Sequence, residues 1–574
     1  MKKRGRSQTP SEGSNDSSKP PRRAPFASLK PRPKPSAADS SQPPRRASIG
    51  THRPKPSAAD SSQPPRRARA GSAQPKPRPN ASRRVHDDRS IEFDRDAPAG
   101  ESGESESRRT ERGSRRSDRE GSTAATRERR FGAPEPIAAS AIGFDRLADF
   151  LTEILPEVER EVVHEKMSLE HSLNYWFRRI RGLNALDRAV VFAAARALFR
   201  HRGWVDAIRA DRFEERLLIA LQLDSYTIDP LARTLARRLG KRGEDLIPLG
   251  DAPGWTERCE GLRHLAGGAP INADPWRLFP AGLRDHLMLP AGVGSAKARY
   301  LSFLETLQKP AELWVRALTE DPEIVWNELR RIGLRPWVHR RVTHAARLDR
   351  DADLTNVEAF RRGRLEIEDL AVQAVGLVAD PDPGERWRVD ERGRGDVALH
   401  IASLMKGKGT VVATAPRDLE MKRIAERARR LPLCNVTTRL WSGKGDVGKA
   451  ASFDGVVVEP ESSAIGTWRR RPEARYWFDP AAIAEFARAQ ASALASGARS
   501  VKPGGLLIYI CPTQTREETQ TIVDAFLERR TDFRLDPFMH PLVASDRPTS
   551  GILHITSEES GGDALFIARL VRGG

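Results

Sequence analysis

Apolar residues recur at helical spacing in the stretch that begins near residue 138. The first stripe consists of Phe144, Leu147, Leu151 and Leu155. Pro156 is expected to end it, because proline lacks a backbone donor and crowds the preceding turn. Asn184, with Asp187 three residues later, fits the N-cap of a helix that should stop near Gly203. We therefore predict a small helical bundle over residues 138–225.

The hydrophobic period changes farther along the chain. Short β-rich runs such as GTVVAT, FDGVVVE and GGLLIYI alternate with helical segments, and ILHIT and ALFIARL are two closing strand candidates. Strands that alternate with helices predict a parallel α/β sheet, which binds ligands at the carboxyl ends of its strands. We expect this α/β domain at 381–574, with a helical linker and a small α/β subdomain at 226–380.

The chain up to residue 135 differs in composition from the rest. Its Lys and Arg exceed its Asp and Glu by 15, out of a net charge of +19 for the whole chain. Phe26, Phe93 and Phe131 are its only aromatic residues among many Pro, Ser and Arg. So little apolar surface cannot offset the entropy lost on ordering. We expect residues 1–135 to form a disordered basic tail.

The tail contains the 16-residue sequence RPKPSAADSSQPPRRA twice, at 32–47 and at 53–68. One hypothesis is a polycationic arm that gains affinity for RNA phosphates by releasing counterions. The alternative is a solubilising extension, since runs of charge are often simply solvated. Both interpretations remain open at the level of the sequence.

Membrane, secreted and metal-binding classes are not favoured by the sequence. It has no apolar run of about 18 residues and no signal-peptide pattern, so we expect a cytoplasmic protein without a membrane span. The cysteines Cys259, Cys434 and Cys511 show no CxxC spacing. Neither a disulfide framework nor a metal site is therefore predicted.

Three segments carry a more specific signal. They are GLNALDRAVVFAAARALFRHRGWVDAI, AFRRGRLEIEDLAVQAVGLVADPDPGER and FDGVVVEPESSAIGTWRRRP. The last follows the pattern F-D-x-V-L-x-D-A-P-C-S-G-x-G-x-x-R-R-x-P without a gap. In these segments the chain resembles the Sun/Fmu-type (RsmB-like, NOL/NOP/Sun) RNA cytosine-C5 methyltransferases, and its helical bundle is similar to their NusB-like RNA-binding domain.

The resemblance implies a class I Rossmann-like methyltransferase domain, preceded by an all-α NusB-like bundle and the basic tail. It also implies methyl transfer from S-adenosylmethionine to C5 of a cytosine in RNA, with rRNA as the expected substrate, by a monomer. In that family one cysteine thiolate adds to C6 of the base and a second cysteine assists release. The resemblance thus directs attention to two loops of the domain.

The catalytic positions differ from the family pattern. In the first loop Glu459 takes the place of the family's Asp, and Ser462 that of its assisting Cys. On the following strand, Cys511 is displaced by one residue from the nucleophile position, which Pro512 occupies. Side chains alternate across a strand, so the displacement turns the sulfur to the opposite face unless a bulge restores it. Cys511 is therefore either the nucleophile or an inert buried thiol.

The cofactor loop and the RNA-contact region also yield candidates. By the resemblance, Gly393 and Gly395 lie where backbone amides approach the cofactor, although GRGDVA replaces the family's A-P-G-G-K-T. Asp418 is the candidate for the ribose hydroxyls and Asp446 for the adenine side. The cluster Arg469, Arg470 and Arg471 is the candidate for RNA contacts.

Three functions remain open from the sequence. The first is a S-adenosylmethionine-dependent RNA cytosine-C5 methyltransferase. The second is a catalytically inactive RNA-binding relative whose cofactor and cysteine sites have degraded. The third is a methyltransferase that acts on a different atom, since Glu461 and Ser462 change the polarity of the pocket.

Overall fold

The computed structural model describes residues 140–574, apart from 181, 209, 225–228, 244–245, 253, 268–269, 289–294, 350–351, 432–434 and 444–446. The predicted basic tail, Cys434 and Asp446 lie outside the described residues. No helix in the described part of the chain has the length and apolarity needed to cross a bilayer.

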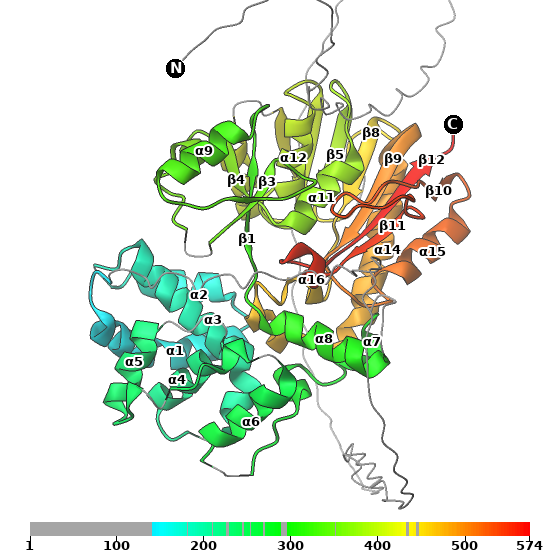
Figure 1. The fold of residues 1–574 in the computed structure, drawn as a ribbon. Helices are drawn as coiled ribbons and strands as arrows, with labels where there is room; N and C mark the ends of the chain where they lie inside the picture. The colour runs from blue at the N-terminus through cyan, green and yellow to red at the C-terminus, as the bar shows by residue number, and fades with distance from the viewer. Residues whose placement is uncertain are drawn as a thin grey trace, which may run out of the picture. The chain divides into compact units, whose positions relative to one another are not determined.

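Helices form the first part of the described chain (Figure 1). They are α1 (Phe144–Val163), α2 (Leu169–Phe177), α3 (Ala185–Ile208), α4 (Phe213–Leu223), α5 (Asp229–Arg238), α6 (Trp255–Leu265), α7 (Leu283–His286) and α8 (Ala296–Gln308), with short 3-10 turns η2 (Leu249–Asp251) and η3 (Pro275–Leu278). The predicted stripe is buried, with Leu147 and Leu151 both at 0% exposure. The cap prediction is confirmed, because the Asp187 amide donates to Asn184 Oδ1 at 2.8 Å and α3 begins at Ala185.

Two predicted helix ends are wrong. Pro156 lies inside α1, which continues to Val163. Burial of Val158 and Val162 at 0% exposure outweighs the roughly 3 kcal/mol that an internal proline costs. Gly203 likewise lies inside α3, where a Cβ would stand only 1.9 Å from the Arg277 carbonyl oxygen. Glycine is therefore present for close packing rather than as a stop.

A small sheet follows the helices. It contains β1 (Leu313–Ala317), β2 (Trp337–Val338), β3 (Ala345–Leu348) and β4 (Leu365–Ile367), with α9 (Glu323–Arg331) and α10 (Glu358–Arg361) between them. The order is β2-β3-β1-β4 with antiparallel pairing. Trp326 of α9 is fully buried against this sheet.

The remaining residues form the larger sheet. Its elements are α11 (Leu370–Ala379), β5 (Arg386–Asp390), α12 (Asp396–Leu404), β6 (Thr410–Ala415), α13 (Asp418–Arg430), β7 (Val436–Leu440), β8 (Phe453–Val458), the 3-10 turns η4 (Ile465–Thr467), η5 (Pro472–Trp477) and η6 (Pro480–Ala482), α14 (Ile483–Ser500), β9 (Val501–Cys511), α15 (Gln520–Arg529), β10 (Phe533–Leu535), β11 (Ile552–Ile555), α16 (Ser557–Ser560) and β12 (Leu565–Arg572).

The strand order of this sheet is β10-β12-β9-β8-β5-β6-β7, with β11 paired to β12. Strands β5 to β9 pair in parallel, while β12 runs antiparallel to β9. The chain leaves β5 toward β6 on one side and later returns with β8 on the other side. Sheets of this type bind their ligands in a crevice at such a reversal, outside the carboxyl ends of the strands. Here the expected crevice lies at the carboxyl ends of β5 and β8.

Both faces of the larger sheet are covered by helices. Residues of α11, α12 and α13 pack with Ile508 and Ile510 on one face. Residues of α14 and α15 pack with Tyr509 and Cys511 on the other. The alternation along β9 thus decides which face each side chain meets. This three-layer α/β arrangement confirms the Rossmann-like fold predicted from the sequence.

Candidate active site at the carboxyl edge of the sheet

The turn between β5 and α12 is built around two glycines. Gly395 has φ +87° and precedes the first residue of α12, and a Cβ there would meet the Ile424 side chain at 3.0 Å. Gly393 has φ +139° and no atom within 4 Å of a built Cβ. Both positions use backbone conformations that side chains rarely adopt. The structure therefore places both predicted cofactor glycines in this turn and leaves space beside Gly393.

The Glu391 side chain, directly after β5, caps the N-terminus of α12. Its carboxylate accepts hydrogen bonds from the amides of Val397 at 3.1 Å and Ala398 at 3.3 Å. Burial, followed by the nearby negative charges of Glu459 and Asp396, raises the pKa of Glu391 well above its usual range. The sequence prediction missed this residue. A carboxylate two positions before Gly-x-Gly at a strand end was the available signal.

Glu420 is the buried carboxylate at the start of α13. It is 5% exposed; one oxygen pairs with Arg417, and Oε2 has no hydrogen-bond partner in the described structure. Asp418, the predicted ribose ligand, is exposed in the first turn of the same helix. Of these two carboxylates, Glu420 therefore has the buried acceptor without a donor.

Glu459 follows β8 and faces the same crevice edge. Its amide donates to the Asp390 carbonyl at 2.8 Å, and its carboxylate accepts from the Arg392 amide at 3.4 Å. Burial raises its pKa to about 7, and the negative charges of Asp396 and Glu420 add to the effect. The Arg392 guanidinium meanwhile pairs with Glu461 at 3.0 Å.

A single carboxylate, Glu518, holds together the loops that follow β8 and β9. It is 0% exposed and accepts five hydrogen bonds at 2.5 to 3.2 Å. The donors are the amide and hydroxyl of Ser463, the hydroxyls of Thr513 and Thr515, and the Gln490 side-chain amide. Such a density of donors compensates for burying the charge. Sequence reasoning did not single out Glu518.

Cys511 is the last residue of β9 and lies within this hydrogen-bonded region. Its side chain is 0% exposed, and Gln490 Nε2 approaches Sγ at 3.9 Å. Burial and the Glu518 charge raise the pKa of the thiol well above its usual range, despite the hydroxyls of Tyr509 and Ser462. The thiol is therefore protonated at neutral pH.

The three predicted catalytic residues come together in space. The Ser462 hydroxyl lowers the pKa of the Cys511 thiol, and the Glu459 charge raises it. Ser462 Oγ also accepts from the Ala464 amide at 3.2 Å. The loop after β8 and the end of β9 thus form one cluster, with Glu459 toward the cofactor turn.

The arginine cluster after η4 has mixed roles. Arg469 is 6% exposed and donates to the carbonyls of Lys309, Pro310 and Ser557. Arg470 pairs with the carboxylates of Asp369 and Asp563. Arg471 is the most exposed of the three and lies 3.6 Å from Glu473. The first two therefore hold the fold together, and Arg471 has the guanidinium most available to a ligand.

Comparison with known proteins gives a consistent assignment. Residues 381–571 match the family model of 16S rRNA methyltransferase RsmB/F. The chain is 30% identical over 220 residues to a probable ribosomal RNA small subunit methyltransferase B of Bacillus subtilis, covering 38% of this chain and 49% of the relative. It is 27% identical over 277 residues to ribosomal RNA small subunit methyltransferase B of Xylella fastidiosa, covering 46% and 62%.

A solved structure extends the likeness in fold. The crystal structure of PH0851 has a TM-score of 0.56 at 20% identity and covers 74% of this chain and 98% of that one. Together with the strand order and the glycine turn, these matches show a class I Rossmann-like methyltransferase fold. Residues 381–571 are thus similar to the 16S rRNA methyltransferases of the RsmB/F family. The chain spans about half the length of the first curated relative it matches.

The residues at the crevice fit S-adenosylmethionine. The side chains of Glu391, Glu420 and Glu459 lie at this edge, and burial raises the pKa of Glu391 and Glu459. Glu420 Oε2 is a buried acceptor without a donor, which a ribose hydroxyl would satisfy. Space beside Gly393 allows a ligand to approach the backbone. Asp446 lies outside the described residues.

Proposed function

We propose that this protein is a S-adenosylmethionine-dependent RNA methyltransferase that acts on C5 of a cytosine in rRNA. The observation that carries the proposal is the convergence of two features at one crevice. The glycine turn with Glu391 and Glu420 lies at the ends of β5 and β6, and the Glu459–Ser462 loop meets Cys511 at the ends of β8 and β9.

On the cofactor side, each residue has a defined task. The backbone at Gly393 and Gly395 lines the approach to the methionine part, and Glu420 Oε2 accepts from a ribose hydroxyl. The bound cofactor supplies an electrophilic methyl group.

On the RNA side, Cys511 is the candidate nucleophile and Ser462 its neighbour. The thiol has to lose its proton and reach C6 of the base before it can form a covalent bond. Its burial means that the end of β9 has to turn the sulfur toward the crevice first. Glu459 would accept a hydrogen bond from the exocyclic amine of the cytosine.

A second candidate function is an RNA-binding relative without methyl transfer. The observation in its favour is the protonated, fully buried Cys511 thiol, with Pro512 at the family's nucleophile position. The predicted NusB-like bundle at 138–225, the exposed Arg471 and the basic tail at 1–135 would then supply the RNA contacts. We propose that either form acts as a cytoplasmic monomer.

The proposal is tested by comparing 5-methylcytosine in rRNA from a deletion strain and its parent. We expect one cytosine to lose its methyl group in the deletion strain and to regain it with the intact gene. Complementation with a Glu420→Ala variant should fail, and an Asp418→Ala variant should succeed. Unchanged 5-methylcytosine at every rRNA position would refute the cytosine assignment.

The tail has a separate test. Removing residues 1–135 should weaken RNA binding and reduce the slope of log affinity against log salt, because fewer phosphates are neutralised. Equal slopes with and without the tail would leave it as a solubilising extension.

A further inference from the structure

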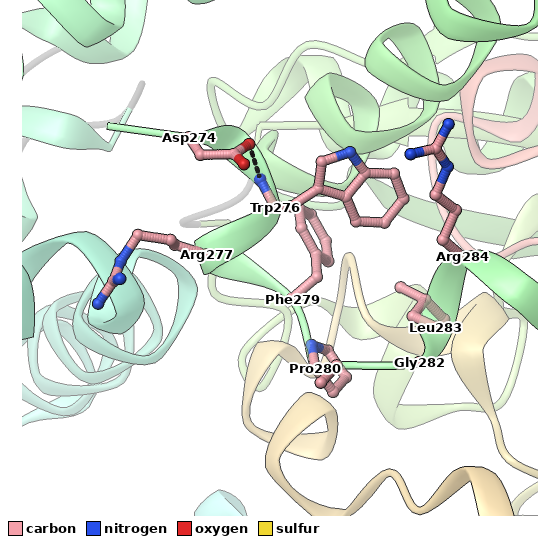
Figure 2. A pocket seen from close by; sticks show the side chains of 9 residues that line it. Asp274, Trp276, Arg277, Phe279, Pro280, Gly282, Leu283 and Arg284 are labelled. Carbon is pink, nitrogen blue, oxygen red and sulfur yellow. Dashed lines mark hydrogen bonds between the residues drawn. The ribbon is translucent and has the colours of Figure 1, made fainter. Parts of the chain in front are cut away.

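A surface pocket lies on the segment that contains η3 and α7. It has a volume of about 350 Å³ and is lined by Trp276, Phe279, Leu283 and the arginines Arg277 and Arg284. Figure 2 shows the Trp276 ring and the Arg284 guanidinium on the same side, with Arg277 extending away from them. Apolar and aromatic walls with a few charged groups are typical of pockets that bind small ligands.

The aromatic residues of the pocket form a fixed platform. The Trp276 ring meets Phe279 edge-on at 6.4 Å and Tyr300 of α8 at 6.0 Å between centroids. Its amide donates to the Asp274 carboxylate at 3.0 Å, which fixes the start of η3. The indole itself is only partly buried. It therefore presents a preorganised surface on which another ring can stack.

The charge of the pocket favours an anionic ligand. Arg284 lies 5.9 Å from the Trp276 ring and 5.5 Å from the Tyr300 ring. In the described part of the chain, neither Arg277 nor Arg284 forms an ion pair with a carboxylate. Asp274 is the one acidic residue among those that line the pocket, and its oxygen is already used by the Trp276 amide.

The same segment is attached to the candidate active site. Leu287 pairs with Thr515 as an antiparallel bridge, and the Met288 amide donates to the Gln514 carbonyl at 2.7 Å. His286 at the end of α7 contacts Glu517 at 2.8 Å. Residues 514–517 lie between Thr513 and Glu518, which form part of the Ser462–Cys511 cluster. The pocket is therefore fixed to the loop that leads into the crevice.

We propose that this pocket binds a nucleotide of single-stranded RNA that flanks the target base. The flanking base stacks on Trp276, and Arg284 binds the adjoining phosphate. Sequence-tolerant recognition of single strands uses this combination of aromatic stacking and arginine. The inference rests on the proposed function, since the pocket would give that enzyme a second contact with its RNA substrate, away from the reacting base.

The test measures binding of a single-stranded RNA of about 12 nucleotides to the full chain, a length within the range of such sites. Trp276→Ala should weaken binding roughly tenfold or more, whereas Trp276→Phe should retain most of the affinity. Arg284→Ala should weaken binding and lower the salt slope by about one. The matched control is Trp337→Ala, because Trp337 is also exposed and has an arginine, Arg347, 4.7 Å from its ring.

The same variants are titrated with S-adenosylmethionine to separate the two proposals. RNA affinity that is unchanged in both Trp276→Ala and Arg284→Ala would overturn the pocket assignment, even if the cofactor still binds. RNA affinity that falls in these variants but not in Trp337→Ala would support it, even if the cofactor fails to bind the parent protein. Ultraviolet crosslinking of the RNA to Trp276, mapped by mass spectrometry, should agree with the affinities.

Discussion

The Ser463 hydroxyl donates a 2.5 Å hydrogen bond to Glu518 and so ties the loop after β8 to the loop after β9. The Ser463 amide donates to the same carboxylate at 2.8 Å. The first loop contains Ser462, at the position of the family's assisting cysteine. The second loop follows Cys511, which lies one residue before the family's nucleophile position. The loops of the candidate active site are thus held together by a fully buried carboxylate.

Glu518→Gln should destabilise the fold. The substitution removes the charge and places an amide donor among five donors, so we expect a loss of roughly 1–3 kcal/mol in the free energy of unfolding. Glu528→Gln, at an exposed position of α15, is the control and should change stability little. Chemical denaturation of both variants provides the measurement. Equal stability would mean that Glu518 does not organise these loops.

The Cys511 thiol should resist alkylation in the native protein. It is fully buried and its pKa is well above the usual thiol range, so little thiolate is available at neutral pH. We expect iodoacetamide at pH 7 to modify it slowly in the native state and rapidly after unfolding, as read by peptide mass spectrometry. Rapid native labelling would show that β9 already exposes the nucleophile. Acceleration by bound RNA would support the movement required for cytosine methylation.

Arg470→Ala should affect stability rather than RNA contact alone. Arg470 bridges Asp369 and Asp563, and burial together with the Asp563 charge raises the pKa of Asp369 to about 7 even with this arginine present. Removing the cation leaves two carboxylates uncompensated, so we expect a loss of roughly 2 kcal/mol or more. Arg471→Ala should cost less than about 1 kcal/mol. If Arg470→Ala remains as stable as the parent but loses RNA affinity, the structural role is wrong.

Stability should depend on pH through Glu459. Its pKa is about 7 in the folded protein against an ordinary 4.5, so the folded state holds the proton more tightly. The contribution of Glu459 to the free energy of unfolding is therefore lost as the pH rises from about 4.5 to 7, and it stays lost above pH 7. Compared with the parent, Glu459→Gln should therefore increase the free energy of unfolding by about 1–2 kcal/mol more at pH 8 than at pH 5.

The control for the pH effect is Glu461→Gln, since Glu461 lies in the same loop but is 57% exposed. Thermal unfolding of the parent and both variants at pH 5 and pH 8 gives the comparison. A Glu459→Gln effect of equal size at the two pH values would contradict the raised pKa.

Much of the fold follows from local patterns. The runs GTVVAT, FDGVVVE and GGLLIYI became the parallel strands β6, β8 and most of β9, because their apolar residues suit a sheet buried on both faces. ILHIT and ALFIARL became β11 and β12. The helix end predicted at Pro156 failed because tertiary packing, which a local pattern does not contain, outweighs the cost of proline.

The candidate site was less predictable, for a physical reason. The role of Glu420 depends on a buried oxygen without a donor, and that of Glu518 on hydrogen bonds to other loops. Both features arise only when the chain folds, so the spacing of these residues in the sequence does not predict them. Arg469 and Arg470 belong to a run of arginines that is typical of RNA-binding surfaces. In the folded chain, however, Arg469 donates to backbone carbonyls and Arg470 pairs with carboxylates of the protein. Only the folded geometry separates such arginines from Arg471, whose guanidinium remains more exposed.

The central claim is that the crevice binds S-adenosylmethionine, and calorimetric titration of the full chain tests it most directly. We predict saturable heat, with affinity at least about tenfold weaker in Glu420→Ala, since a buried acceptor would lose its ribose partner. Asp418→Ala, two residues away on the exposed face, should bind like the parent. If the parent protein gives no heat of binding at about 1 mM cofactor, the account is contradicted. A Kd of about 1 mM corresponds to a binding free energy of only about 4 kcal/mol.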